Sequence, residues 1–137
     1  MKSSLYVFLL TLLVLAGSVT AQERFESGPY KGFVKEQPEL NTVEIPKPFK
    51  VSLVRGRIDY SGGEKLPGAY FEIRDKSGRV RTAITDENGQ FALAGVPRGK
   101  YDFRVSKNQF KPFVGTVIVS RRWWKSKPIS ILIQLGD

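Results

Sequence analysis

The sequence predicts an all-β protein: a seven-stranded antiparallel β-sandwich, preceded by an export signal and an extended, proline-rich arm. From Val51 onward, apolar and polar residues alternate with a period of two, as half-buried strands require. Clusters of Gly, Pro, Asn, Asp and Ser separate these runs. About seven short strands at this spacing are typical of two packed sheets. No long helical period follows the signal.

Residues 1–21 have the pattern of a cleavable signal peptide. Lys2 supplies a short positive region, residues 5–16 are mostly apolar, and small residues follow. We expect cleavage between Ala21 and Gln22. A transmembrane anchor is the alternative, but a span needs about 20 apolar residues and this run is shorter. The chain contains no cysteine, which excludes a lipid-anchored N-terminus and disulfides. The expected location is secreted or periplasmic, and a bacterial source is favoured.

Residues 22–49 differ in composition from the rest. They contain four prolines and no sustained period, which predicts an extended arm because proline fixes φ and removes a donor. Tyr30, Phe33 and Phe49 are its large anchors, and we expect them to dock along the side of the domain. The β-sandwich domain is then residues 50–137.

The charge balance favours anionic partners. The chain has 22 Lys and Arg against 13 Asp and Glu, and only Lys2 lies in the signal, so the exported chain carries a net charge of +8. Polysaccharide, an anionic membrane surface and nucleic acid are the candidate partners. Nucleic acid is the least favoured of these outside the cytoplasm.

The stretch "TDENG", residues 85–89, is interpreted as a structural turn. Asp86 and Asn88 are residue types that favour turns, and Gly89 suits a positive φ. A calcium loop is the alternative, but it needs oxygen ligands at alternate positions and a terminal bidentate carboxylate. Here the acids are adjacent, and no acid follows in "QFALAGV".

The residue types argue against catalysis. The chain has no histidine and no cysteine, which removes the common general base, thiol nucleophiles and most zinc ligands. Asp86 and Glu87 are neighbours in or beside a strand, so their side chains point to opposite faces. We expect no enzyme activity, no cofactor and no metal site.

The strongest surface signal is "SRRWWKSKP", residues 120–128. If the preceding strand continues, one indole faces the core and the other faces out. One interpretation is structural, with one tryptophan in the core and one on the arm. The other is a platform for sugars, acidic glycans or a membrane. The candidate patch consists of Arg121, Arg122, Trp123, Trp124, Lys125 and Lys127.

A second basic set occupies outward positions of the predicted strands. The alternation predicts a solvated face rather than a site for these residues. They are Arg55, Arg57, Arg74 and Arg104.

Ordered motifs over residues 54–110 give a resemblance to a known family. They are "GRID", "LPGA", "TDENGQF", "GVPRGKYDFRV" and a closing Phe110. In these the chain resembles the carboxypeptidase regulatory-like domain family. The resemblance implies a transthyretin-like (prealbumin-like) sandwich, related to the carbohydrate-binding-like fold and completed through Leu135. It also implies an accessory module, as found beside metallocarboxypeptidases and in bacterial surface proteins.

Three departures accompany the resemblance. Where the family has glycine before its aromatic residue, this chain has Gln109, and we expect Asn108 to take the left-handed conformation instead. The hydroxyisourate hydrolases of this fold need histidines, which are absent. An isopeptide crosslink from Lys50 would lack its asparagine, since "ISILIQLGD" contains none.

The function expected from the sequence is therefore a non-catalytic binding or accessory module of the bacterial cell envelope. Its ligand would be a carbohydrate or another anionic polymer. The alternative is a structural protein that pairs with another envelope protein. A small enzyme is the least favoured hypothesis.

Overall fold

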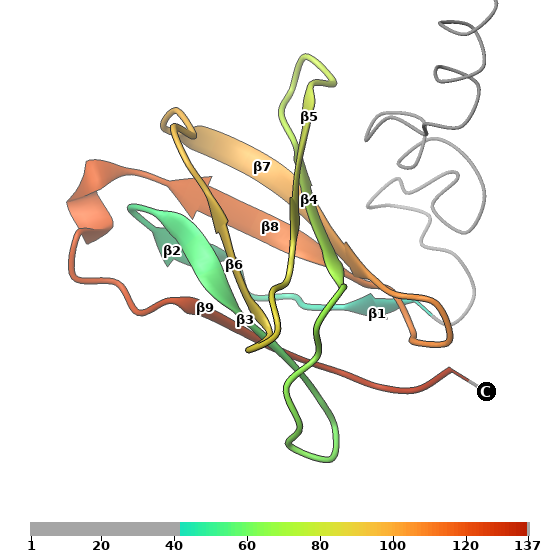
Figure 1. Ribbon diagram of the computed structural model, residues 1–137. Helices are drawn as coiled ribbons and strands as arrows, with labels where there is room; N and C mark the ends of the chain where they lie inside the picture. Colours follow the sequence, from blue (N-terminus) through green and yellow to red (C-terminus); the bar gives the residue numbers. More distant parts are fainter. Residues whose placement is uncertain (1–41, 137) are drawn as a thin grey trace, which may run out of the picture.

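The computed structural model describes residues 42–136, which form a sandwich of two β-sheets (Figure 1). The predicted signal peptide, its cleavage site, and arm residues 22–41 with Tyr30 and Phe33 lie outside these residues. No helix within 42–136 has the length and apolarity to span a membrane. The strands are β1 (Val43–Glu44), β2 (Phe49–Val51), β3 (Val54–Tyr60), β4 (Tyr70–Arg74), β5 (Val80–Ile84), β6 (Gln90–Leu93), β7 (Gly99–Ser106), β8 (Phe113–Val119) and β9 (Ile129–Ile133).

The two sheets differ in size. The large sheet has the order β1-β8-β7-β4-β5, with β2 also paired to β8, and the small sheet has the order β6-β3-β9. The predicted all-β sandwich is confirmed. Three pairings are parallel, however: β1 with β8, β2 with β8, and β3 with β9. The antiparallel pairing expected from the sequence holds for β3 with β6, β4 with β5, β4 with β7, and β7 with β8.

The segment before Lys50 contributes to the large sheet. Val43 pairs with Phe113, and Phe49 pairs with Val117. The two strands are separated at "IPKP", because proline has no N–H to donate to the ladder. The last residues of the proposed arm are thus hydrogen-bonded along the β8 edge.

Phenylalanines from both sheets fill the core. The Phe71 ring of β4 stacks on Phe91 of β6 with 4.2 Å between centroids, which joins the sheets. Phe71 also stacks on Phe103 at 5.6 Å, and Phe103 packs on Phe49 at 5.7 Å. Such aromatic pairs add to the gain from burying apolar surface. The anchor Phe49 therefore contacts the core itself.

The turn after β7 differs from the expectation. Gln109, not Asn108, carries the positive φ, at 74°, and it is the one non-glycine residue of 42–136 to do so. Its carbonyl accepts a hydrogen bond from the Gly136 amide at 2.7 Å, while the Phe110 amide donates to Lys107. Gln109 thus takes a left-handed conformation that glycine adopts most easily.

Candidate ligand-binding surface

The tryptophan segment is a short 3₁₀ turn, η2 (Arg121–Trp123), and not a continuation of β8. The Ser120 side chain caps the turn by accepting from the Arg122 amide at 3.3 Å. The Ser120 amide donates to the Val51 carbonyl at 3.0 Å, and the Ser52 amide donates to the Ser126 hydroxyl at 3.3 Å. These bonds tie the segment to the end of β2 and stop the β8 ladder.

Neither indole enters the core, so the expectation of one core tryptophan is wrong. Trp123 is half-buried, with Lys50 Nζ 5.7 Å from its ring centroid. Trp124 is 71% exposed, and Lys125 Nζ lies 4.8 Å from its centroid. In a turn, neighbouring side chains do not alternate between opposite faces as they do in a strand. Both rings instead have a cation beside them at the surface.

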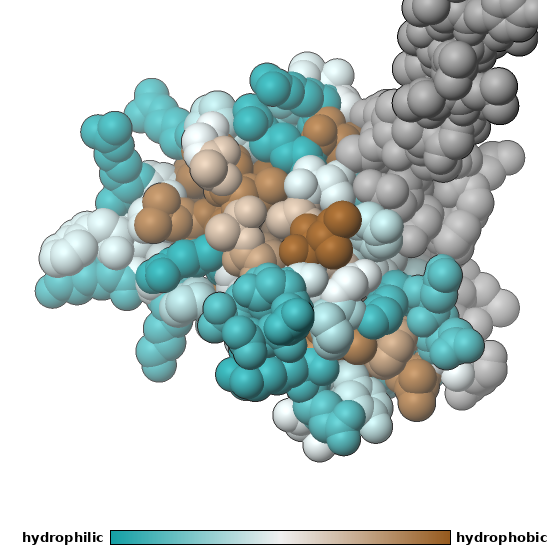
Figure 2. Space-filling view, viewed as in Figure 1, coloured by the Kyte–Doolittle hydropathy of each residue, from teal (hydrophilic) through white to brown (hydrophobic). Residues whose placement is uncertain are grey.

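The connections around η2 form one basic end of the sandwich. A hollow of about 470 Å³ lies where the β2–β3, β6–β7 and β8–β9 connections meet. These connections (52–53, 94–98 and 120–128) contain five Lys and Arg and no Asp or Glu. Figure 2 shows mostly hydrophilic side chains at the end where Figure 1 places η2. We call this set the basic-aromatic end: Lys50, Leu53, Arg98, Arg121, Arg122, Trp123, Trp124, Lys125 and Lys127.

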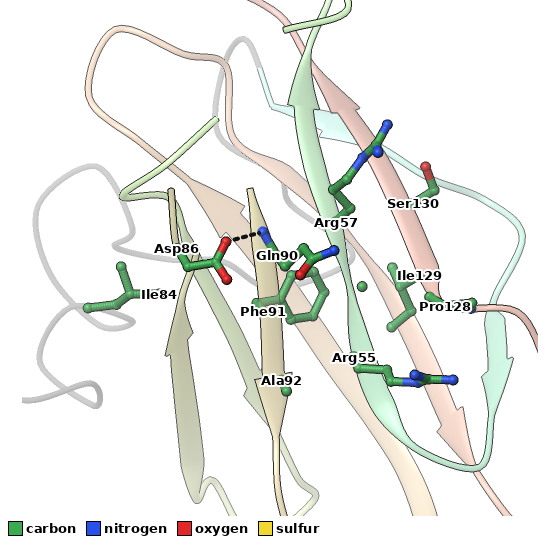
Figure 3. Close-up of a pocket in the computed structure, with 11 residues that line it drawn as sticks. Arg55, Arg57, Ile84, Asp86, Gln90, Phe91, Ala92, Pro128, Ile129 and Ser130 are labelled. Carbon is green, nitrogen blue, oxygen red and sulfur yellow. Dashed lines mark hydrogen bonds between the residues drawn. The ribbon is translucent and has the colours of Figure 1, made fainter. Parts of the chain in front are cut away.

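An open groove of about 650 Å³ lies on the outer face of the small sheet (Figure 3). Arg55 and Arg57 of β3 line its centre. Gln90 of β6 lies on one side of them and Ser130 of β9 on the other. Pro128, which directly follows Lys127, lines the same groove. The groove therefore begins where the basic-aromatic end stops.

The two arginines of the groove are not equivalent. Arg57 donates to the Asp59 carboxylate through Nε at 2.9 Å and Nη2 at 2.8 Å. Arg55 is exposed and has no ion-pair partner among residues 42–136. Arg55 is thus the groove cation that remains available to an anion.

The basic set predicted as one solvated face is divided between the two sheets. Arg55 and Arg57 are exposed on the small sheet, as expected. Arg104 is only 2% exposed, and it lies on β7 directly opposite Glu72 of β4, which is 0% exposed. The interpretation of Arg104 as solvated is therefore wrong, because its face of the large sheet is not open to water. Arg74 is partly buried on the same face.

The "TDENG" stretch forms the turn between β5 and β6. Asp86 Oδ1 accepts from the Asn88 and Gln90 amides at 2.8 and 2.9 Å, and Gly89 has φ of 72°. Figure 3 shows the Asp86–Gln90 bond at the rim of the groove. Oδ1 of Asp86 is thus engaged in holding the turn.

The sequence reasoning missed Thr85, which is buried. Its hydroxyl accepts from the Ala69 amide at 2.8 Å and donates to the Leu66 carbonyl at 2.6 Å. Thr85 thereby fastens the β3–β4 connection to this turn. Its place before Asp86 in a polar run gave no signal of burial.

Acidic side chains are dispersed over the described part of the chain. No three Asp, Glu, His or Cys residues within it are grouped as metal ligands. Asp75, in the β4–β5 turn, accepts from the Ser77 hydroxyl at 2.6 Å, and this bond lowers the pKa of the Asp75 carboxyl below its ordinary value.

The sequence profile of the carboxypeptidase regulatory-like domain family matches residues 53–122, just over half of the chain. The chain belongs to this family. The resemblance seen in the motifs is thereby confirmed, and the regulatory-like domain extends from the β2–β3 connection through β8 into η2. The match ends at Arg122, immediately before the two tryptophans. No curated protein matches the chain.

Solved structures resemble this chain at low identity. A chain of the type II cohesin–X-dockerin complex of Acetivibrio cellulolyticus is 24% identical over 63% of this chain and 59% of that chain, with a TM-score of 0.46. The major pilin subunit BcpA of Bacillus cereus is 18% identical over 61% of this chain and 27% of its own, with a TM-score of 0.43. Chlorocatechol 1,2-dioxygenase of Pseudomonas putida is 13% identical over 80% and 70%, with a TM-score of 0.44.

Proposed function

We propose that this regulatory-like domain is an exported, non-catalytic binding module of the bacterial cell envelope that captures an acidic polysaccharide through its basic-aromatic end. The observation that carries the proposal is Trp124. Its indole is 71% exposed, with Lys125 Nζ 4.8 Å from the ring centroid. An indole this exposed gains little from packing within its own chain.

The chemistry of the end fits a charged sugar chain. An indole face packs on the C–H face of a pyranose, and neighbouring cations attract the carboxylates or sulfates of an acidic glycan. With no acid in the three connections, nothing there repels an anion. Since Pro128 joins this end to the groove, a polymer that leaves Trp124 can continue toward Arg55.

The test is equilibrium binding of the exported chain to polygalacturonate, with neutral dextran as a reference. Trp124→Ala should weaken binding by about tenfold, since a stacked base or ring is worth roughly 1–3 kcal/mol. The double variant Arg121→Gln/Arg122→Gln should weaken binding and reduce its dependence on salt. Arg79→Gln/Arg81→Gln removes the same charge from the β5 edge and should leave binding within about twofold of wild type.

Three outcomes would overturn the proposal. If both double variants weaken binding equally, net charge alone is responsible and the end is not a site. If the chain binds vesicles of phosphatidylglycerol and phosphatidylcholine but not polygalacturonate, the partner is a membrane surface. A mass in solution that rises with protein concentration, without polysaccharide binding, would favour the alternative of an assembly protein.

A further inference from the structure

The outer face of the large sheet is buried along its central strands. Five of its outward side chains on β4, β7 and β8 have exposed fractions of 0–3%. They are Glu72 at 0%, Val114 at 1%, Arg104 and Thr116 at 2%, and Ser106 at 3%. In a two-layer sandwich this face would normally meet solvent, because the core lies on the other side.

No strand of the described residues lies over this face. Every strand of 42–136 belongs to one of the two sheets, and the small sheet packs on the inner face. The turn η2 contacts β2 at the end of the sandwich. A third layer of residues 42–136 is therefore not what covers Glu72 and Arg104.

We propose that the N-terminal segment of the same chain, residues 22–41, packs across the outer face of the large sheet over Glu72 and Arg104. The segment leads directly into β1, which pairs with β8 at the edge of this sheet. Its 20 residues can extend to about 70 Å. The distance from β8 to β5 across the sheet is about 15 Å, so the segment is long enough to cross more than once.

Charge and composition fit this occupant. Residues 22–41 carry four Glu and three Lys and Arg, whereas residues 42–137 carry 18 Lys and Arg against nine Asp and Glu. The segment is thus slightly acidic beside a strongly basic domain. It also offers apolar side chains, Phe25, Tyr30 and Phe33 among them, to cover Val114.

The sequence of β8 supports two-sided burial independently. The strand reads "FVGTVIV" and has no charged residue. A strand with one solvent-exposed face instead alternates apolar and polar residues. This strand lies next to β1, where the segment enters. Its outward positions therefore suit contact with protein better than contact with water.

Thiol labelling tests the proposal, because the chain has no cysteine of its own. Thr116→Cys places one thiol on the covered face, and Ser130→Cys places one on the exposed face of the small sheet. In the exported chain, Thr116→Cys should react with dithiobis-nitrobenzoate about 100-fold more slowly than Ser130→Cys, since reaction requires local opening. Adding Tyr30→Ser and Phe33→Ser should accelerate the Thr116→Cys thiol at least about tenfold while leaving Ser130→Cys unchanged.

Three results would overturn the assignment. One is equal reaction rates for the two thiols. Another is no acceleration when the aromatics of the segment are replaced. The third is protection that grows with protein concentration, because a second copy would then be the cover. If Thr116→Cys does not fold, Ser106→Cys on β7 probes the same face. The inference does not depend on the proposed polysaccharide site.

Discussion

The outer faces of the two sheets of this regulatory-like domain differ in their exposure to solvent. On the small sheet, six outward side chains are exposed, two on each strand: Arg55, Arg57, Gln90, Ala92, Ser130 and Leu132. Asp59, which pairs with Arg57, is the outward residue of β3 that is buried. On the large sheet, the outward charges Glu72 and Arg104 are buried. On both sheets, arginines occupy outward positions that alternate with core residues along the strand. The comparison shows that period-two alternation tells which way a side chain points, but not whether solvent is on that side.

The largest expected difference between the faces is the response to losing an arginine. Arg104→Met should lower the free energy of unfolding by about 3–5 kcal/mol, because Glu72 keeps a buried charge opposite it. Arg55→Met, on the open face, should change it by less than about 0.5 kcal/mol. Urea unfolding of both variants measures this. Equal effects would mean that the faces are energetically alike.

The turn that links the two sheets offers the next effect. Gly89 has φ of 72°, and a Cβ there would lie 2.6 Å from the Ile58 carbonyl oxygen. Gly63 has φ of 86° but open space around it. Gly63→Ala should cost about 1 kcal/mol for the backbone alone, and Gly89→Ala about 2–4 kcal/mol. Thermal unfolding distinguishes them, and similar melting temperatures would contradict the tight approach at Gly89.

The same turn should not respond to calcium. Asp86 Oδ1 accepts two backbone amides and thereby fixes the conformation without an ion. The melting temperature should be the same in calcium and in chelator. A rise of many degrees in calcium would restore the metal-loop interpretation.

The two tryptophans should differ by a smaller amount. Trp123→Ala should cost about 1–2 kcal/mol, because only part of its apolar surface is buried. Trp124→Ala should cost less than about 0.5 kcal/mol. Chemical denaturation of each variant measures the pair. A loss at Trp124 as large as at Trp123 would show that the exposed indole is structural.

The smallest expected effect is an increase in stability when Gln109 is replaced. Gln109→Gly removes a left-handed side-chain conformation and should raise stability by about 0.5 kcal/mol, net of the flexibility of glycine. Asn108→Gly is the matched control and should not stabilise. Greater stabilisation by the control would place the strained residue at 108.

Sequence reasoning succeeded where local rules decide the outcome. The period-two alternation of apolar and polar residues predicted the sandwich, and the ordered turn motifs indicated the family. It failed at the tryptophans, because Ser120 caps a 3₁₀ turn where a continuing strand was expected. It named Phe49 as an anchor of the arm, and this ring packs on Phe103.

The buried face was missed for a different reason. Arg104 alternates with core residues in "YDFRVS", as an outward residue should. Its burial depends on what lies across the sheet, which no local pattern records. The uncharged run "FVGTVIV" was the available signal, because a strand with one solvent-exposed face usually carries charged or polar side chains at alternate positions.

Arginine footprinting of the unmodified chain tests the difference between the faces most directly. Phenylglyoxal modifies accessible guanidinium groups, and peptide mass spectrometry reports the extent at each arginine. The account predicts rapid modification of Arg55 on the open face and protection of Arg104 until the chain is unfolded in denaturant. Modification of Arg104 in the folded chain at the rate of Arg55 would contradict it.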